Sequence, residues 1–220
     1  MVRAIIFDVD GVLVDSMRFH ADAWANVFCE VGINITREDI YVLEGSNEKA
    51  IIKAIFEKVG KESEPWHFEY LVNKKREIIE FDKIEPFKNV PDCLKKLKSY
   101  FKLAAVSGSS RNMVEKVMNK FFSFCFEVII TGDDFERGKP DPIPFLKALA
   151  KLDINKNECL VVENSPLGIT AAKRAEIYCV AVASTLEPDK LQHADLVFRD
   201  HTALFDFLKN IIQNRSLIDH

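Results

Sequence analysis

Long apolar runs and a strong net charge are both missing from this chain of 220 residues. No apolar stretch approaches the roughly 20 residues that span a bilayer, so we expect no membrane partner. The N-terminus lacks the basic flank and the cleavage site of a signal peptide, and residues 2–7 are instead predicted to form a buried strand. A net charge of −4 gives no electrostatic reason to expect nucleic acid as a partner.

Paired cysteines are missing as well. The cysteines are odd in number, far apart and mostly set among apolar neighbours, and no C-x-x-C pair suggests zinc. We therefore expect reduced thiols that pack as small hydrophobic side chains, as in a cytoplasmic protein. The five are Cys29, Cys93, Cys125, Cys159 and Cys179.

Short apolar runs alternate with helical patterns over most of the chain. One helix is predicted to begin at Pro142, with Phe145, Leu146 and Leu149 facing inward, and Ser165 followed by proline is typical of a helix start. This alternation predicts a parallel sheet covered by helices on both faces. The predicted strands are Ala4–Phe7, 103–106, Val128–Ile130, 159–162 and Tyr178–Val182.

The region between the first two predicted strands breaks this alternation. Only helical patterns occur from about residue 17 to residue 81, and Thr36 with Asp39 fits a capping box. About 65 residues is too long for a simple crossover connection. We therefore predict an α/β fold with a Rossmann-like parallel-sheet core, residues 1–15 and 83–220, and an inserted all-helical cap domain, residues 16–82.

Two carboxylates, Asp8 and Asp10, come directly after the first strand. Open α/β sheets bind their ligands at this carboxyl edge. Carboxylates held close together repel each other and need a cation or a shared proton, and Mg²⁺ prefers hard oxygen ligands. A solvated turn with aspartates at cap positions is the alternative interpretation.

Other polar groups follow later strands. Residues 107–111 offer hydroxyls and backbone N–H groups at a helix start, which suits an anion, although an ordinary N-cap serine explains them too. Lys139 is held between glycine and proline just ahead of a helix, where its ammonium can point at the sheet edge. Glu163 and Asn164 add oxygen ligands after the fourth strand. The chain order thus predicts acids, hydroxyls and one lysine at the same edge.

These motifs resemble those of the haloacid dehalogenase superfamily, and especially its β-phosphoglucomutase-like branch, which has a helical cap after the first motif. The resemblance covers nearly the whole chain and implies the fold of that superfamily. The matching motifs are D-x-D-G-x-L-x-D-S at residues 8–16, Ser107, G-K-P-D-P at residues 138–142 and E-N-S-P-L-G-I at residues 163–169.

The resemblance implies a role for each motif residue. Asp8 would attack a phosphoryl group and form an aspartyl-phosphate, while Asp10 would protonate the leaving oxygen and then activate water. Ser107 would donate a hydrogen bond to a phosphate oxygen, and Lys139 together with Mg²⁺ would offset negative charge. The metal ligands would be the Asp8 side chain, the Asp10 backbone carbonyl and the acids of the fourth motif.

The chain departs from the branch at two places. The fourth motif usually has Glu-Asp, whereas here Glu163 is followed by Asn164, which offers a carbonyl oxygen but no charge. Either Glu163 bears more of the metal binding or the metal binds more weakly. In the cap, residues 45–47 are Gly-Ser-Asn where β-phosphoglucomutases carry an arginine for the sugar phosphate.

We therefore predict a Mg²⁺-dependent phosphatase of small phosphorylated metabolites, with a phosphomutase as the alternative. The candidate substrate-binding residues are His20 and Asn47 in the cap and Ser109 and Arg111 in the core. His20 is more often a structural contact than a ligand. We expect a monomer or a weak dimer.

Other classes fit less well. Dehalogenases and phosphonate hydrolases lack the second acid, here Asp10, and the latter use a cap lysine as a Schiff base. Lys74 and Lys75 could imitate that lysine, but lysines on a helix are usually solvated. A phosphoacceptor switch has no cap insertion, and a non-catalytic interaction protein fits poorly with an intact set of motif residues.

Overall fold

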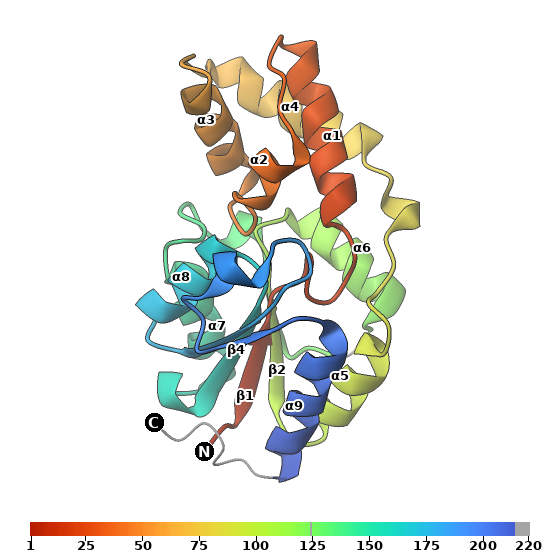
Figure 1. Ribbon diagram of the computed structural model, residues 1–220, viewed down its shortest axis with the longest axis vertical. Coiled ribbons are helices and arrows are strands. Elements are labelled where there is room, and N and C mark those ends of the chain that lie inside the picture. Colours follow the sequence, from red (N-terminus) through yellow and green to blue (C-terminus); the bar gives the residue numbers. More distant parts are fainter. Residues whose placement is uncertain (124, 214–220) are drawn as a thin grey trace.

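A parallel sheet forms the centre of the molecule in the computed structural model, which describes residues 1–123 and 125–213 (Figure 1). The strand order is β3-β2-β1-β4-β5-β6, and every neighbouring pair is parallel. This order places β1 at the middle of the sheet. The strands are β1 Ala4–Phe7, β2 Lys102–Val106, β3 Val128–Ile130, β4 Cys159–Glu163, β5 Tyr178–Val182 and β6 Leu196–Phe198.

Helices fall into two groups (Figure 1). The first four helices gather beyond the carboxyl edge of the sheet, and the others pack against its faces. The first group is α1 Met17–Glu30, α2 Arg37–Tyr41, α3 Glu48–Lys58 and α4 Pro65–Ile78. The second group is α5 Val90–Lys98, α6 Arg111–Phe121, α7 Ile143–Leu152, α8 Pro166–Arg174 and α9 His201–Gln213. Short 3₁₀ turns are η1 Phe81–Lys83, η2 Gly132–Asp134, η3 Lys156–Glu158 and η4 Pro188–Leu191.

The predicted α/β fold and its five strands are confirmed, and one strand was missed. The missed strand, β6, has three residues at the edge of the sheet, and its side chains are exposed or half-buried. A strand this short and this exposed has no apolar run that separates it from a loop.

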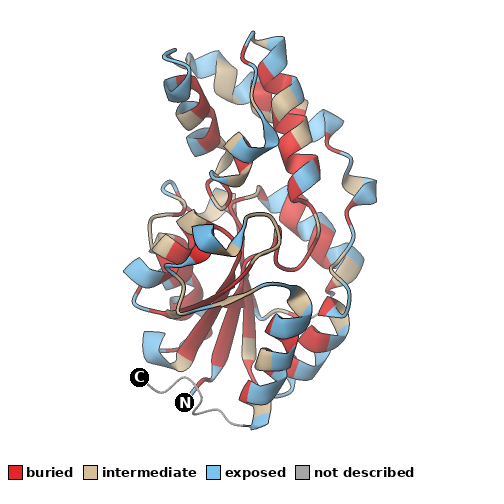
Figure 2. Ribbon diagram, in the orientation of Figure 1, coloured by how far each residue is buried: buried red, intermediate tan, exposed pale blue. Residues whose placement is uncertain are grey.

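Both faces of the sheet are buried, as predicted (Figure 2). Alternate residues of a strand point to opposite faces, so Ile5 packs with residues of α5, α6 and α9 while Ile6 packs with residues of α7 and α8. One inward-facing prediction was wrong, because Leu146 is 44% exposed. The buried stripe of α7 instead runs through Phe145, Ala148, Leu149 and Leu152.

Helices α1–α4 share an apolar cluster of their own, separate from the two clusters on the sheet. Helix α1 takes part in two of these clusters: Phe19 and Ala23 pack with the sheet cluster, whereas Trp24 and Val27 pack within the cap. The cap cluster consists of Met17, Ala21, Trp24, Val27, Phe28, Ile33, Ile40, Ile51, Ile52, Ile55, Phe56 and Leu71.

The two chain segments that connect the cap with the sheet run side by side. The backbone N–H of Asp15 donates to the carbonyl of Glu85 at 2.9 Å, and that of Phe87 donates to the carbonyl of Leu13 at 3.1 Å. The predicted domain boundaries, at residues 15/16 and 82/83, fall in or next to these paired segments.

Candidate active site

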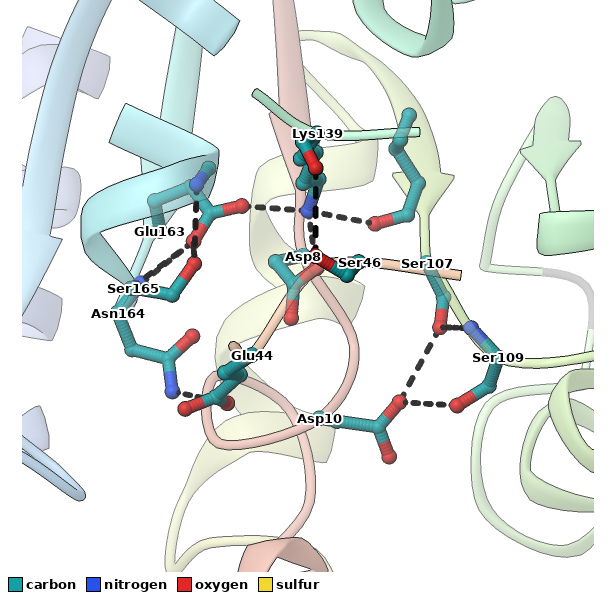
Figure 3. Close-up of polar contacts among 12 residues, drawn as sticks. Asp8, Asp10, Glu44, Ser46, Ser107, Ser109, Lys139, Glu163, Asn164 and Ser165 are labelled. Atoms are coloured by element: carbon teal, nitrogen blue, oxygen red, sulfur yellow. Dashed lines mark hydrogen bonds and ion pairs between the residues drawn. The ribbon is translucent and has the colours of Figure 1, made fainter. Parts of the chain in front are cut away.

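Four predicted residues meet at the carboxyl edge of the sheet (Figure 3). Asp8 follows β1, Ser107 follows β2, Lys139 lies in the loop before α7, and Glu163 ends β4. All four are buried. The parallel register of β1 with β2 and β4 aligns the ends of these strands, so residues about 100 positions apart in sequence become neighbours.

Lys139 lies between two buried carboxylates. Its ammonium forms ion pairs with Asp8 and Glu163. Burial by itself would lower the pKa of Lys139, but the charges of Asp8 and Glu163 raise it instead, so the side chain stays protonated. Burial raises the pKa of Asp8 well above its usual range, and Lys139 opposes that shift.

Both carboxylate oxygens of Glu163 accept hydrogen bonds. Its Oε2 accepts from the backbone N–H groups of Asn164 at 2.9 Å and Ser165 at 3.1 Å, and from the Ser165 hydroxyl at 3.0 Å, while its Oε1 faces Lys139. Ser165 also caps α8 by accepting from the N–H of Gly168. A Cβ at Gly168 would lie 1.8 Å from Glu163 Oε1, so this turn of α8 needs glycine.

Asp10 accepts hydrogen bonds from both the core and the cap. Its Oδ2 accepts from the hydroxyls of Ser107 at 3.1 Å and Ser109 at 2.9 Å, and its Oδ1 lies 2.7 Å from Ser16 Oγ and 3.1 Å from His20 Nε2. Burial by itself would raise the pKa of Asp10, but His20 and the hydroxyl donors outweigh burial and lower it. The carboxylate form of Asp10 is therefore favoured.

The predicted substrate-binding residues divide into two pairs. His20 and Ser109 line the same cavity as Asp8. Arg111 does not reach this cavity, because its guanidinium contacts the Asp134 carboxylate at 2.7 Å on the surface. Asn47 caps α3 through its Oδ1 and donates to the Glu136 carbonyl at 3.2 Å, so both ends of its side chain already have partners.

Lys75 lies beside the site, and the expectation that it is solvated was wrong. It is 3% exposed rather than solvated, and it lines the same cavity as Asp8. Its ammonium lies 3.2 Å from Glu48 Oε1 and 4.9 Å from the centre of the Trp24 ring. The four-residue spacing from Leu71, which is also buried, was the available signal.

Glu44 is a site residue that was missed. It lies in the cap loop between α2 and α3, is 4% exposed, and its Oε1 accepts from Asn164 Nδ2 at 2.6 Å (Figure 3). The same Nδ2 lies 3.3 Å from Thr185 Oγ1. Nothing in the local sequence marks a loop glutamate as buried, so no signal was available.

The side chains at this edge offer oxygen atoms that suit a metal ion. Within the described ranges, no three His, Cys, Asp or Glu side chains form a ready-made cluster for an ion. However, Asn164 Oδ1 and Glu44 Oε2 are buried acceptors without a hydrogen-bond partner. Because a hard cation such as Mg²⁺ takes carboxylate and carbonyl oxygens, these atoms fit its chemistry.

Two cavities meet at the contact between cap and core. One of about 40 Å³ lies at Asp8 and Asp10, and one of about 820 Å³ lies beside it, with Gly108 and Glu48 lining both. The larger cavity is also lined by Arg76 of α4. The arrangement leaves room for a small molecule next to the carboxylates.

Comparisons with known proteins agree with this geometry. Residues 5–182 match the family model described as haloacid dehalogenase-like hydrolase. The chain is 26% identical to validoxylamine A 7'-phosphate phosphatase of Streptomyces hygroscopicus subsp. limoneus over 92% of this chain and 95% of that protein. It is 32% identical to phosphoglycolate phosphatase of Aquifex aeolicus over 79% of this chain and 81% of that protein.

A solved structure shows the same fold. The crystal structure of β-phosphoglucomutase from Clostridium difficile superimposes with a TM-score of 0.86 and 25% identity, over 98% of this chain and 99% of that one. Among the residues that the structure describes, no helix is long and apolar enough to cross a membrane. With matching motifs, fold and family model, this chain belongs to the haloacid dehalogenase-like hydrolase family.

Proposed function

We propose that this protein is a Mg²⁺-dependent phosphatase that hydrolyses small phosphorylated metabolites. The observation that carries the proposal is the buried Asp8 carboxylate, which pairs with Lys139 and lines a cavity together with Asp10, an acceptor of the Ser107 hydroxyl. Two relatives with related sequences are phosphatases by name, which supports the same reaction class.

In the first step an oxygen of Asp8 attacks phosphorus, and the bond from phosphorus to the leaving oxygen breaks. Asp10 gives its proton to the leaving oxygen, and Lys139 offsets charge on Asp8 and the phosphoryl group. In the second step water attacks phosphorus in the aspartyl-phosphate. Asp10 takes the proton of that water, inorganic phosphate leaves, and the Asp8 carboxylate is restored.

The two roles of Asp10 require opposite protonation states. Its four hydrogen bonds favour the carboxylate, which is the form needed for the base. When Ser107 and Ser109 turn their hydroxyls to phosphate oxygens, Asp10 loses two donors. Loss of hydrogen bonds to the charged form raises a carboxyl pKa, so substrate binding itself favours the acid form.

Mg²⁺ would be held by Asp8, the backbone carbonyl of Asp10 and the carbonyl oxygen of Asn164. Glu163 accepts hydrogen bonds from Lys139, Ser165 and the backbone, so we assign it to positioning Lys139 rather than to the metal. When bound, the ion supplies positive charge that offsets the phosphoryl oxygens.

A β-phosphoglucomutase-like phosphomutase is the second candidate, favoured by the full-length structural similarity to such an enzyme. A mutase must bind the far phosphate of a sugar bisphosphate firmly, which arginine does well. Arg111 is paired with Asp134, while Lys75 and Arg76 are both paired with Glu48. Because these three cations already have carboxylate partners, they are less available to a second phosphate group, which favours water as the acceptor.

The test is a panel of phosphorylated sugars, nucleotides and small acids, assayed for phosphate release with Mg²⁺. We expect at least one good substrate, and we expect β-glucose 1-phosphate, primed with a trace of the 1,6-bisphosphate, to yield phosphate faster than glucose 6-phosphate. Dominant isomerisation would favour the mutase instead.

The matched control is Asp8→Asn, because an amide cannot form the acyl phosphate. This variant should stay folded and lose all detectable turnover, as followed by phosphate release and circular dichroism. Near-native hydrolysis by Asp8→Asn would contradict the mechanism.

A further inference from the structure

A carboxylate of the cap lies inside the site formed by the core. Glu44 belongs to the loop between α2 and α3, yet its carboxylate contacts the side chain of Asn164, which follows β4 (Figure 3). It lines the same small cavity as Asp8 and Asp10. Within the described residues, the cap thus places an acid among the core carboxylates.

Both partners of this contact retain an unused acceptor. Glu44 Oε2 and Asn164 Oδ1 are buried and have no hydrogen-bond partner. Leaving a buried polar atom without a hydrogen-bond partner destabilises the folded state. While Glu44 is ionised, these two oxygen acceptors cannot satisfy each other, so they require either a donor or a cation.

The charge at this edge points to a cation. Asp8, Asp10 and Glu44 line one small cavity, and the Lys139 ammonium pairs with Asp8 and with Glu163 but with neither Asp10 nor Glu44. Asn164 adds a carbonyl oxygen but no negative charge. When ionised, Glu44 supplies a negative charge next to that carbonyl.

The backbone leaves space for this pair. Gly11 has a φ of +81°, and a Cβ there would lie 2.0 Å from Asn164 Nδ2 and 2.8 Å from Glu44 Oε1. Any other residue at position 11 would therefore displace the contact and would be strained in this backbone conformation. Gly11 of the first motif therefore allows Glu44 of the cap loop to contact Asn164.

We propose that Glu44 is a metal ligand contributed by the cap, which supplies the negative charge that Asn164 lacks at the divalent-cation site. This inference rests on the proposed Mg²⁺-dependent function. A ligand from the cap makes the complete site depend on the contact between cap and core. By linkage, Mg²⁺ binding stabilises this contact, and the contact in turn raises Mg²⁺ affinity.

The test is calorimetric titration with MgCl₂ alone, without substrate. Glu44→Gln should weaken Mg²⁺ binding on the order of tenfold or more, and adding Asn164→Asp to that variant should restore much of the loss. Glu38→Gln, at an exposed position of the same cap, should leave the affinity unchanged. Unchanged affinity in Glu44→Gln, or a loss that Asn164→Asp does not restore, would overturn the proposal.

Hydrogen exchange provides a second measurement on the wild-type protein, which removes any dependence on how a variant folds. Mg²⁺ should slow exchange of the backbone amides in residues 42–47, and equal exchange with and without Mg²⁺ would count against the proposal. Because neither experiment uses a substrate, failure of the phosphatase assay and failure of this inference are separate results.

Discussion

Single residues in this site are governed by buried charge. The Lys139 side chain is fully buried, and the two carboxylates that it contacts are buried as well. Removing one partner from a buried ion pair costs more than the pair itself contributes, because the remaining charge stays desolvated. Burial likewise favours one protonation state of a titratable side chain over the other, because it removes water from the charged form.

We predict that Lys139→Met destabilises the protein by about 3–5 kcal/mol, because Asp8 and Glu163 lose their counter-charge. The double variant Lys139→Met/Glu163→Gln should cost less than the sum of the two single changes, since it removes one of the stranded charges. Urea unfolding of the four proteins measures this coupling. Strict additivity would show that the two groups do not interact.

His201 is a titratable side chain whose protonation state depends on its surroundings in the fold. Its Nε2 lies 3.0 Å from the Val12 carbonyl, and its ring stacks on Phe87 with centroids 3.7 Å apart. Burial lowers the pKa of His201 below its ordinary value of 6.5. The neutral ring is therefore the form that the folded state favours.

The pH dependence follows from that direction. Below pH 6.5 the unfolded chain binds a proton that the folded protein resists, so the free energy of unfolding falls as the pH drops from 7 toward 5. His201→Gln should reduce this slope, and His193→Gln, at an exposed position, should not. Equal slopes in wild-type protein and His201→Gln would contradict the prediction.

At the scale of elements, the site depends on how closely a cap loop approaches a strand end. Ser46 Oγ lies 3.4 Å from the Lys139 carbonyl, and Asn47 donates to the Glu136 carbonyl. Gly108, just after β2, allows this approach. A Cβ there would lie 2.5 Å from the carbonyl oxygen of Ser46 and 2.7 Å from that of Gly45.

We predict that Gly108→Ala pushes the cap loop away from the sheet edge. Backbone atoms cannot move aside as a flexible side chain would, and a misplacement of about 1 Å can cost on the order of 100-fold in rate. The value of kcat/KM on the best panel substrate should therefore fall strongly while the urea midpoint stays near that of the wild type. An unchanged kcat/KM would show that this close approach is not needed for turnover.

At the scale of the whole molecule, two linkers join a helical cap to a sheet domain. They lie side by side and are paired by backbone hydrogen bonds and a bridge between Val14 and Pro86. The cap has its own apolar cluster, so it can move as one body, but Phe19 and Ala23 of α1 pack with the sheet cluster. Movement is therefore expected to pivot near the start of α1.

We predict that crystals with and without a phosphate analogue differ mainly by a rotation of residues 17–81 about hinges at residues 15–16 and 80–86. Closure of the cap would exclude water from Asp8 and shape the site around the substrate. Superposition on the sheet alone measures the rotation. An identical angle between cap and sheet in several liganded states would contradict a moving cap.

Much of the architecture follows from local patterns in the sequence. Runs such as Ala4–Phe7 are buried on both sides and cannot be mistaken for a surface segment, and the N-cap at Ser165 and the capping box of Thr36 form as predicted. The catalytic candidates Asp8 and Asp10 were found because they directly follow a strand. All of these signals extend over a few neighbouring residues, so the sequence by itself determines them.

Only the tertiary structure decides which side chains near the site can act there. Arg111 is turned away because Asp134, 23 positions later, lies beside it, and Lys75 is buried because Trp24 and Glu48 cover it. The contact of Glu44 with Asn164 joins residues 120 positions apart. Such contacts depend on how the cap sits against the sheet, and no local pattern in a single sequence carries that information.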